Sequence, residues 1–150
     1  MRNTVYHSIK LFLVLSIVIL GACQKEKNNS QPATCAINVS TIAGTYKITS
    51  IKYKGNFYSS ETDYLQFMDP CERDDEIFLS ANGTYRHFDK GQVCSPDGND
   101  DGIWSLNDKI LTSDGLINGT IEKFDCKVLV FYIVDLIDPG DKMTFVMTRQ

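Results

Sequence analysis

The segment "EIFLSANGTYRHF", residues 76–88, has the pattern of an antiparallel β-hairpin, and the rest of the fold can be predicted outward from it. Two runs of alternating large and polar residues flank the turn residues "ANG" at 81–83. A three-residue loop with Gly83 in the left-handed conformation forms such a turn with a bulge. The register that follows pairs Leu79 with Tyr85 and Ile77 with His87. Because a one-residue slip would exchange the two faces of a strand, this apolar pairing selects the register.

Continuing the hairpin count outward brings two cysteines close together. A two-residue loop would place Cys71 directly opposite Cys94, and a three-residue loop places them within a position or two of each other. A Cys71–Cys94 disulfide is therefore the first choice, and Cys35–Cys126 remains by elimination. Free thiols or a zinc site are the rival interpretation. Against it, the chain has no CxxC motif, and His87 is the only histidine after residue 22.

The chain from about residue 43 onward alternates short strand patterns with turn residues. No segment keeps a helical period of 3.6 residues with capping signals, so we expect little helix. The expected strands lie at 44–53, 76–80, 84–88, 102–106, 109–112, 117–124, 127–134 and 142–148. Sequential strands joined by tight turns are antiparallel neighbours. The predicted fold class is therefore all-β, an antiparallel up-and-down meander that closes into a small barrel.

The N-terminus has the pattern of an export signal. Arg2 and Lys10 precede an apolar run at 11–22 that is too short to span a bilayer comfortably. Its ending, Leu20-Gly21-Ala22-Cys23, resembles the lipobox of bacterial lipoproteins, which implies cleavage before Cys23 and acylation (diacylglyceryl, palmitate) of that residue. An ordinary signal peptide with a chance cysteine is the alternative. The predicted organisation is a signal peptide at 1–22, a lipid-anchored flexible tether at 23–41 and a barrel domain at 42–150.

The residues after Cys23 favour the outer membrane as the location. The segment 24–32 is polar and lacks aromatic residues, as a flexible tether does. Its charges also partly resemble the surface-export signals of some Gram-negative lipoproteins, and a plain solvated tether is the alternative. Nothing at Gln24 resembles the Asp that retains lipoproteins at the inner membrane. The predicted membrane contact is thus the N-terminal acyl anchor on the outer membrane, with exposure at the cell surface as an option.

Composition excludes one class of partner and indicates the compartment. Of the 15 basic residues, two lie in residues 1–22, so 13 basic residues remain against 19 acidic ones, a net charge of about −6. An acidic chain without a basic stripe is a poor nucleic-acid binder. Four cysteines besides Cys23, in a chain with an export signal, indicate an oxidising compartment.

Several motifs in this order resemble the small lipocalin-like domain of bacterial lipoproteins over residues 42–148. The motifs are Gly44-Thr45-Tyr46-Lys47, Cys71-Glu72-Arg73-Asp74-Asp75, the hairpin at 77–85, Cys94, and Gly102-Ile103-Trp104-Ser105-Leu106. The resemblance implies an antiparallel barrel and supports the Cys71–Cys94 bridge, but it supplies no common activity. Tyr46 departs from the family, which favours Trp there as a plug of the barrel base. Arg149 is the only late Arg that could lie near this plug.

The sequence favours a protein that is not an enzyme. It contains no GxSxG, no HExxH and no glycine-rich phosphate loop. A nucleophile paired with histidine would have to use His87. Asp74 and Asp75 could serve as acid and base, but adjacent strand residues point to opposite faces. No catalytic residue and no organic cofactor is therefore predicted.

Residues 97–102, "DGNDDG", match the start of a calcium-binding loop. The expected ligands are Asp97, Asn99 and Asp101, with Asp108 at the twelfth position in place of the usual Glu. No helices flank the loop, and the residues from 102 onward are expected to form a strand. A solvated acidic turn is the alternative to this calcium site.

The barrel interior is the candidate ligand site. The inward-facing positions expected from strand alternation are Tyr46, Ile48, Leu79, Tyr85, His87, Trp104, Leu106, Val130, Tyr132, Phe145 and Met147. The residues expected to line a ligand pocket are Tyr46, Leu79, Tyr85, His87, Trp104, Tyr132 and Phe145. The ligand would lie beside Trp104, with His87 or Tyr85 orienting it, because a few polar groups in an apolar concavity are typical of such sites.

Two functions fit this sequence. The first is a lipid-anchored lipocalin-like protein that binds a small hydrophobic molecule. The second is a non-enzymatic surface interaction module, a complex subunit or adhesin-like protein, whose barrel is solidly packed and whose partner is another protein. An interior cavity of a few hundred cubic ångströms would distinguish them.

Overall fold

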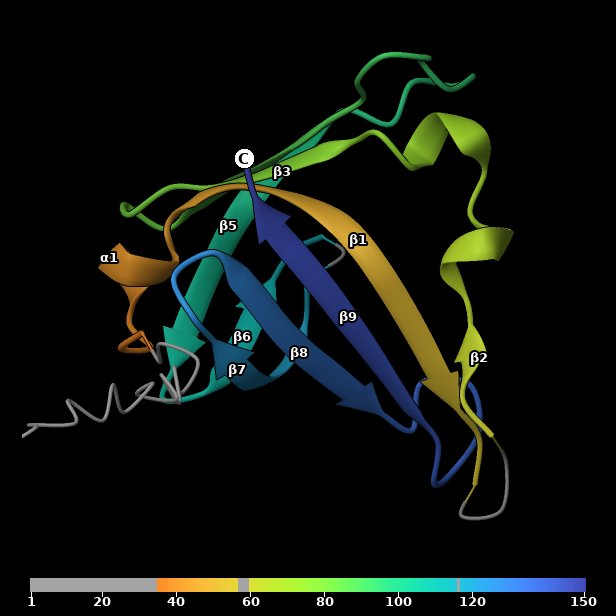
Figure 1. Ribbon diagram of the computed structural model, residues 1–150. Coiled ribbons are helices and arrows are strands. Elements are labelled where there is room, and N and C mark those ends of the chain that lie inside the picture. Colours follow the sequence, from red (N-terminus) through yellow and green to blue (C-terminus); the bar gives the residue numbers. More distant parts are fainter. Residues whose placement is uncertain (1–34, 57–59, 116) are drawn as a thin grey trace, which may run out of the picture.

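The structure is a computed structural model that describes residues 35–56, 60–115 and 117–150 (Figure 1). The predicted signal peptide and Cys23 lie outside the described residues. The elements in chain order are α1 (Val39–Ile42), β1 (Gly44–Lys54), β2 (Thr62–Asp63), the 3-10 helices η1 (Leu65–Phe67) and η2 (Pro70–Glu72), β3 (Glu76–Leu79), β4 (Thr84–Phe88), β5 (Asp100–Asn107), β6 (Ile110–Ser113), β7 (Gly119–Phe124), β8 (Val128–Val134) and β9 (Lys142–Arg149). None of the described helices is long and apolar enough to cross a membrane.

The strands form one closed antiparallel barrel. From β3 to β9 each strand pairs with the next one in sequence. The long strand β1 closes the ring, because residues 44–46 pair with β3 and residues 46–54 pair with β9. The two-residue β2 adds to the far end of β1. The predicted fold class, an antiparallel meander that closes into a barrel, is confirmed.

The hairpin of β3 and β4 has the predicted register. Ile77 lies opposite His87, and Leu79 lies opposite Tyr85. The backbone N–H of Ser80 donates to the carbonyl of Thr84 at 2.8 Å, which leaves three residues in the loop. Gly83 has a φ of +88°, the left-handed conformation that a side chain would disfavour. The loop is therefore the three-residue form rather than the two-residue form.

Both predicted disulfides are present. Cys71–Cys94 joins η2 to the loop between β4 and β5, with Cα atoms 5.3 Å apart. Cys35–Cys126 joins the start of the described chain to the turn between β7 and β8, with Cα atoms 5.2 Å apart. The first bridge lies within a local hairpin unit, whereas the second closes a sequence separation of 91 residues.

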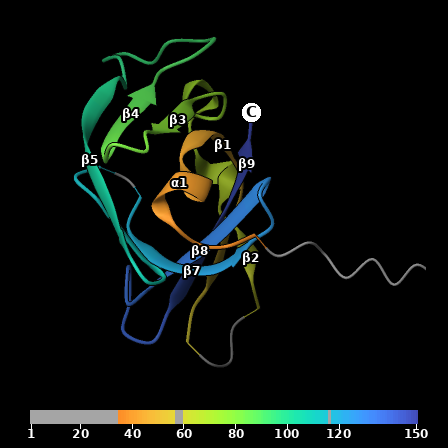
Figure 2. The ribbon, with the colours of Figure 1, turned by 90° about the vertical axis from the view of Figure 1, so that its left-hand side faces the viewer.

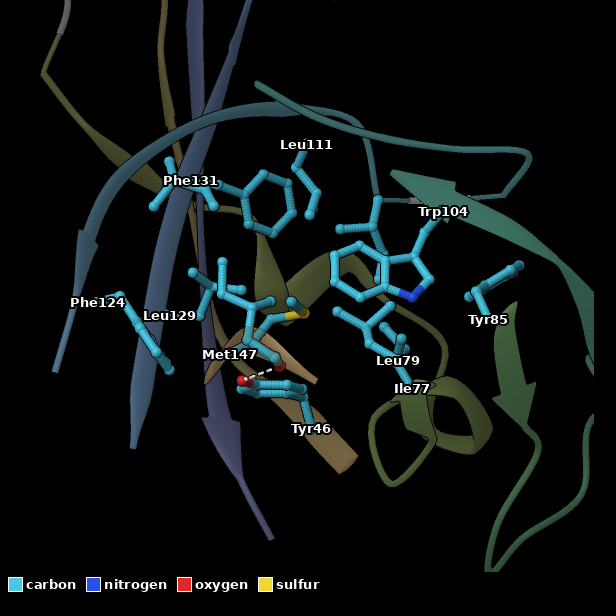
Figure 3. Close-up of a cluster of buried hydrophobic side chains, with 13 residues drawn as sticks. Tyr46, Ile77, Leu79, Tyr85, Trp104, Leu111, Phe124, Leu129, Phe131 and Met147 are labelled. Atoms are coloured by element: carbon cyan, nitrogen blue, oxygen red, sulfur yellow. Dashed lines mark hydrogen bonds between the residues drawn. The ribbon is translucent and has the colours of Figure 1, made fainter. Parts of the chain in front are cut away.

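One end of the barrel is plugged by Tyr46 and covered by α1. Figure 2 looks toward α1, with the strands arranged around it. The Tyr46 hydroxyl donates to the Ile42 carbonyl at 2.7 Å (Figure 3). It also accepts from the Arg149 guanidinium at 2.7 Å. The same guanidinium also donates to the Thr41 and Ala43 carbonyls. Tyr46 therefore closes this end with Arg149 beside it, although the resembling family favours Trp at this position, and we call this the closed end.

Residues 35–41 belong to the folded domain, so the predicted extent of the tether, 23–41, is wrong for these residues. The Cys35 N–H donates to the Phe124 carbonyl at 2.9 Å, and Ile37 and Val39 pack against the core. Asn38 and Thr41 form a reciprocal capping box at the start of α1. Polar composition predicted a tether, but a disulfide and two apolar side chains fix this segment to the barrel.

A core of buried hydrophobic side chains packs inside the barrel (Figure 3). Its fully buried side chains come from the strands around the barrel and from α1: Ile42, Tyr46, Ile77, Leu79, Tyr85, Trp104, Leu111, Ile117, Ile121, Phe124, Leu129, Phe131 and Met147. Five of these side chains are aromatic, namely Tyr46, Tyr85, Trp104, Phe124 and Phe131, and each is at most 4% exposed. Large rings therefore make up much of this core.

Candidate functional site

The other end of the barrel contains a cavity of about 350 Å³, which we call the open-end cavity. Its apolar walls are made by Ile48, Ile51, Met68, Ile77, Ile117, Phe131, Ile133, Leu136, Phe145 and Met147. Strands β1, β3, β8 and β9 supply most of these side chains. Phe131 and Phe145 face each other across β8 and β9 as stacked rings, 4.9 Å between centroids. The polar lining residues are Glu72, Asp75 and His87.

The segment that carries η1 and η2 forms one wall of this cavity. It runs from β2 to β3 along the side of the barrel (Figure 1) and contributes Met68 and Glu72. The Arg73 guanidinium holds it together by donating to the Met68 and Gln66 carbonyls at 2.9–3.1 Å. The Cys71–Cys94 disulfide ties the segment to the neighbouring loop. A short helical segment thus completes a cavity that the strands alone leave open.

His87 and Asp75 form a buried pair at the polar side of the cavity. His87 Nε2 lies 3.2 Å from Asp75 Oδ2, and these side chains are 13% and 5% exposed. His87 Nδ1 lies 2.8 Å from the Gly98 carbonyl oxygen. A carbonyl only accepts hydrogen bonds, so Nδ1 carries the proton in this contact. The other carboxylate oxygen of Asp75, Oδ1, accepts from the Lys90 N–H at 3.0 Å.

The loop between β4 and β5 is organised by Asp89. Its carboxylate accepts from the N–H groups of Cys94 and Gly98, at 3.0 and 2.7 Å. These bonds fix the Gly98 carbonyl at the position where it meets the His87 ring. The orientation of His87 at the cavity is therefore set by a loop that Asp89 and the Cys71–Cys94 bridge both hold.

The structure brings two of the seven predicted pocket residues to the cavity, namely His87 and Phe145. The prediction is wrong for Tyr46, Leu79, Tyr85 and Trp104, which lie in the packed core and do not line the cavity. Their polar tips are satisfied inside the protein: Trp104 Nε1 donates to the Ser80 carbonyl at 2.8 Å, and the Tyr85 hydroxyl donates to Asp100 at 2.9 Å. A ligand in the cavity therefore does not lie beside Trp104.

Tyr132 and Val130 do not contribute to the interior, so their predicted inward orientation is also wrong. In β8 the buried positions are Leu129 and Phe131, and Ile133 lines the cavity. The Tyr132 ring lies 4.2 Å from Lys142 Nζ, on the other face of the sheet. Alternation along a strand places 130 and 132 on that same face.

Several cavity residues were not predicted from the sequence, and Phe131 and Ile133 of β8 are among them. Ile51 enters the interior because the pairing of β1 with β9 shifts register between Ile48 and Ser50. Met68 and Glu72 come from the helical segment before β3, and Leu136 comes from the turn after β8. The pattern Asp69-Pro70-Cys71-Glu72, with Pro at the first helical position and Glu at the third, is a helix-start signal that could have indicated η2.

The expected calcium ligands are not gathered in the structure. Asp108 lies in the turn after β5, and the residues of that strand separate it from Asp101 by roughly 20 Å. The prediction of Asp108 as a calcium ligand is therefore wrong. Asp97 Oδ1 accepts from the Asn99 N–H at 3.1 Å, and Asn99 Oδ1 accepts from the Asp89 N–H at 3.1 Å. Within the described ranges, no group of three or more His, Cys, Asp or Glu side chains is arranged to hold a metal ion.

A comparison with protein families gives a result that agrees with the observed barrel fold. A family model described as a lipocalin-like domain matches residues 42–135, which is more than half of the chain. The match begins at the end of α1 and includes every strand from β1 to β8. No curated protein and no solved structure matches the chain.

Proposed function

The chain belongs to the lipocalin-like domain family, and from this premise we propose that it binds a small hydrophobic molecule in the open-end cavity without catalysing a reaction. The observation that carries the proposal is the cavity itself. It measures about 350 Å³, has mainly Ile, Met, Leu and Phe side chains in its wall, and has a single polar side. Volumes of about 300 to 1,000 Å³ with few polar groups are usual for small-ligand sites.

The same cavity argues against the solidly packed interaction module. That alternative requires side chains to fill the interior from end to end, but Tyr46, Tyr85, Trp104 and Phe124 do not line the cavity, and about 350 Å³ stays open beside them. The ligand would enter opposite the Tyr46 plug, between β8, β9 and the η1–η2 segment. The size of the cavity, at the low end of the usual range, favours a compact ligand over a long-chain lipid.

The test is to fill the cavity and measure binding of an uncharged fluorescent probe. Ile133 lines the cavity, whereas its neighbour Val134 is 54% exposed. Ile133→Trp should weaken binding of N-phenyl-1-naphthylamine about tenfold or more, because the indole occupies the ligand volume. Val134→Trp, the matched control, should leave the affinity unchanged. Equal affinity in both variants, or no binding by the wild type, would contradict the proposal.

We also propose that the barrel is exported and anchored to the outer membrane through acyl groups on Cys23. The support comes from the sequence at 11–23, the small residues before Cys23 and the four other cysteines, which suit an oxidising compartment. Acyl chains at the mature N-terminus give stable anchoring when more than one is attached. The ligand would then be bound outside the cytoplasm.

Mass spectrometry of the protein from membranes tests the anchor. The N-terminal peptide of the wild type should begin at Cys23 and carry the added mass of acyl groups. Cys23→Ala should leave an uncleaved or soluble protein with an intact barrel. Unmodified N-terminal mass in the wild type, together with unchanged membrane fractionation of the variant, would contradict the anchor but not the binding function.

A further inference from the structure

We propose that the open-end cavity selects an apolar amine, through a hydrogen bond from the ligand ammonium to Asp75 and His87. This inference rests on the proposed binding function and adds the chemical class of the ligand. Asp75 is buried and lines the cavity. Its Oδ2 is buried and accepts no hydrogen bond from the described residues. A buried carboxylate oxygen without a donor is costly, so a ligand that supplies one gains affinity.

His87 Nε2 and Asp75 Oδ2 face each other, and both are hydrogen-bond acceptors when His87 is neutral. Nδ1 of His87 donates to the Gly98 carbonyl, so the neutral ring presents the lone pair of Nε2 toward Asp75. Nε2 and Asp75 Oδ2 then lie 3.2 Å apart with no hydrogen between them. An ammonium group has three N–H donors and can serve both acceptors at once. A carboxylate ligand has no hydrogen-bond donor for these two acceptors.

The charges around the cavity also favour a cation. Its ionisable lining residues are Glu72, Asp75 and His87, and neither Lys nor Arg is among the lining residues. Two basic side chains of adjoining segments have other partners: Lys90 Nζ lies 3.5 Å from Glu76, and the Arg73 guanidinium donates to backbone carbonyls. With an apolar wall around it, a ligand charge here is only weakly screened by water. An amine therefore gains attraction where a fatty-acid anion would meet repulsion.

The experiment compares three ligands that share one apolar body, namely octylamine, octanol and octanoate, by calorimetry with the wild-type protein at neutral pH. Octylamine should bind about tenfold tighter than octanoate, as expected for one charge-assisted hydrogen bond. Asp75→Asn should remove this preference. Asp101→Asn removes the same charge on the outer face of β5, opposite Arg86, and should keep the preference.

The outcomes separate this inference from the binding function on which it rests. Equal affinity for the three head groups, or tighter binding of octanoate, overturns the amine inference while the cavity remains a binding site. Absence of binding for all three, together with no binding of the naphthylamine probe, overturns the binding function itself. Because the head-group comparison uses the wild type, the test stands even if Asp75→Asn does not fold.

Discussion

The Arg149 guanidinium donates a hydrogen bond of 2.7 Å to the Tyr46 hydroxyl and joins the last strand of the barrel to the first. Its central carbon also lies 5.2 Å from the centre of the Tyr46 ring and 5.5 Å from that of Phe124. Cation–π contacts of this kind strengthen when the groups are shielded from water. The pair lies where β1 meets β9, the pairing that closes the barrel. The closed end is thus held by a polar contact between the two strands that complete the ring.

Removing the Tyr46 hydroxyl should destabilise the barrel without emptying its core. Tyr46→Phe keeps the ring but leaves the Ile42 carbonyl and the Arg149 guanidinium each short of one partner. We expect the free energy of unfolding, measured by urea titration, to fall by about 1 to 2 kcal/mol. Tyr132→Phe is the control, because that ring lies on the outer face beside Lys142. Equal stability of Tyr46→Phe and the wild type would contradict a structural role for the contact.

Removing the Cys71–Cys94 disulfide should reduce both stability and ligand affinity. The bridge closes a short loop, so the double Ser variant should lose roughly 3 kcal/mol of unfolding free energy. It also fixes the segment from which Met68 and Glu72 reach the cavity. We therefore expect weaker binding of the naphthylamine probe, measured under conditions where the variant remains folded.

The second disulfide is the matched control for that experiment. The Cys35–Cys126 bridge spans 91 residues and lies at the closed end, away from the cavity. Its double Ser variant should lose more stability, roughly 4 to 5 kcal/mol, yet the folded protein should bind the probe as the wild type does. If both variants lost the same affinity for the probe, a general destabilisation of the barrel would explain the loss, rather than a change in the cavity wall.

Asp141 should make the turn between β8 and β9 sensitive to acid. Burial alone would raise the pKa of its carboxyl, but N–H donors of Asp138, Ile137 and Leu136, at 2.8–2.9 Å, outweigh burial and lower the pKa. Because the pKa of the Asp141 carboxyl is lower in the folded protein than in the unfolded chain, the ionised carboxylate stabilises the fold at pH values above the ordinary pKa of Asp. That contribution is lost as pH falls through the lowered pKa of the folded state.

The acid sensitivity can be measured by urea unfolding between neutral pH and pH 3. Asp141→Asn should be less stable than the wild type at neutral pH, and the difference should shrink as the solution becomes acidic. Asp108→Asn is the control, because Asp108 is exposed in a turn with φ of 55°, a conformation that Asn also adopts. A constant difference between Asp141→Asn and the wild type across this pH range would contradict the prediction.

The Tyr85 hydroxyl should lose its proton at a higher pH than an ordinary tyrosine. Burial, the hydrogen bond to Asp100 and the negative charge of Asp100 raise the pKa of Tyr85 to about 12. Because the folded pKa lies above the unfolded one, this interaction stabilises the protein fully below about pH 10 and is lost as pH rises toward about 12. Carbon NMR of labelled tyrosine should include a ring-carbon signal that titrates toward pH 12, and Tyr85→Phe should remove that signal. A signal from Tyr85 that titrates at the ordinary value of about 10 would contradict this.

The hairpin at 76–88 could be predicted from sequence because its local signals agree. The turn residues, the glycine at 83 and the large side chains of Leu79 and Tyr85 all favour one register. The disulfide to Cys94 then followed from counting along the same two strands. Where turn chemistry and apolar alternation coincide, a short segment contains enough information to define its own structure.

The cavity could not be predicted in the same way because its walls depend on partners distant in sequence. Strand β8 reads "VLVFYIV" and is apolar throughout, so nothing in it distinguishes the inner face from the outer. Pairing with β9 makes that choice and places Phe131 opposite Phe145. The register shift in β1 near Ser50 likewise depends on its pairing with β9. The inward position of Ile51 therefore emerges only in the assembled barrel.

The Cys35–Cys126 disulfide also determines how a pulling force on the N-terminal side would enter the protein. Without it, tension on residues preceding Cys35 would pass through α1 into β1 and peel that strand from its neighbours. With it, the covalent bond transfers the tension directly to the turn between β7 and β8. The strand that closes the ring is then shielded from the pull. A barrel tethered by its N-terminus could thus be pulled without separating β1 from β3 and β9.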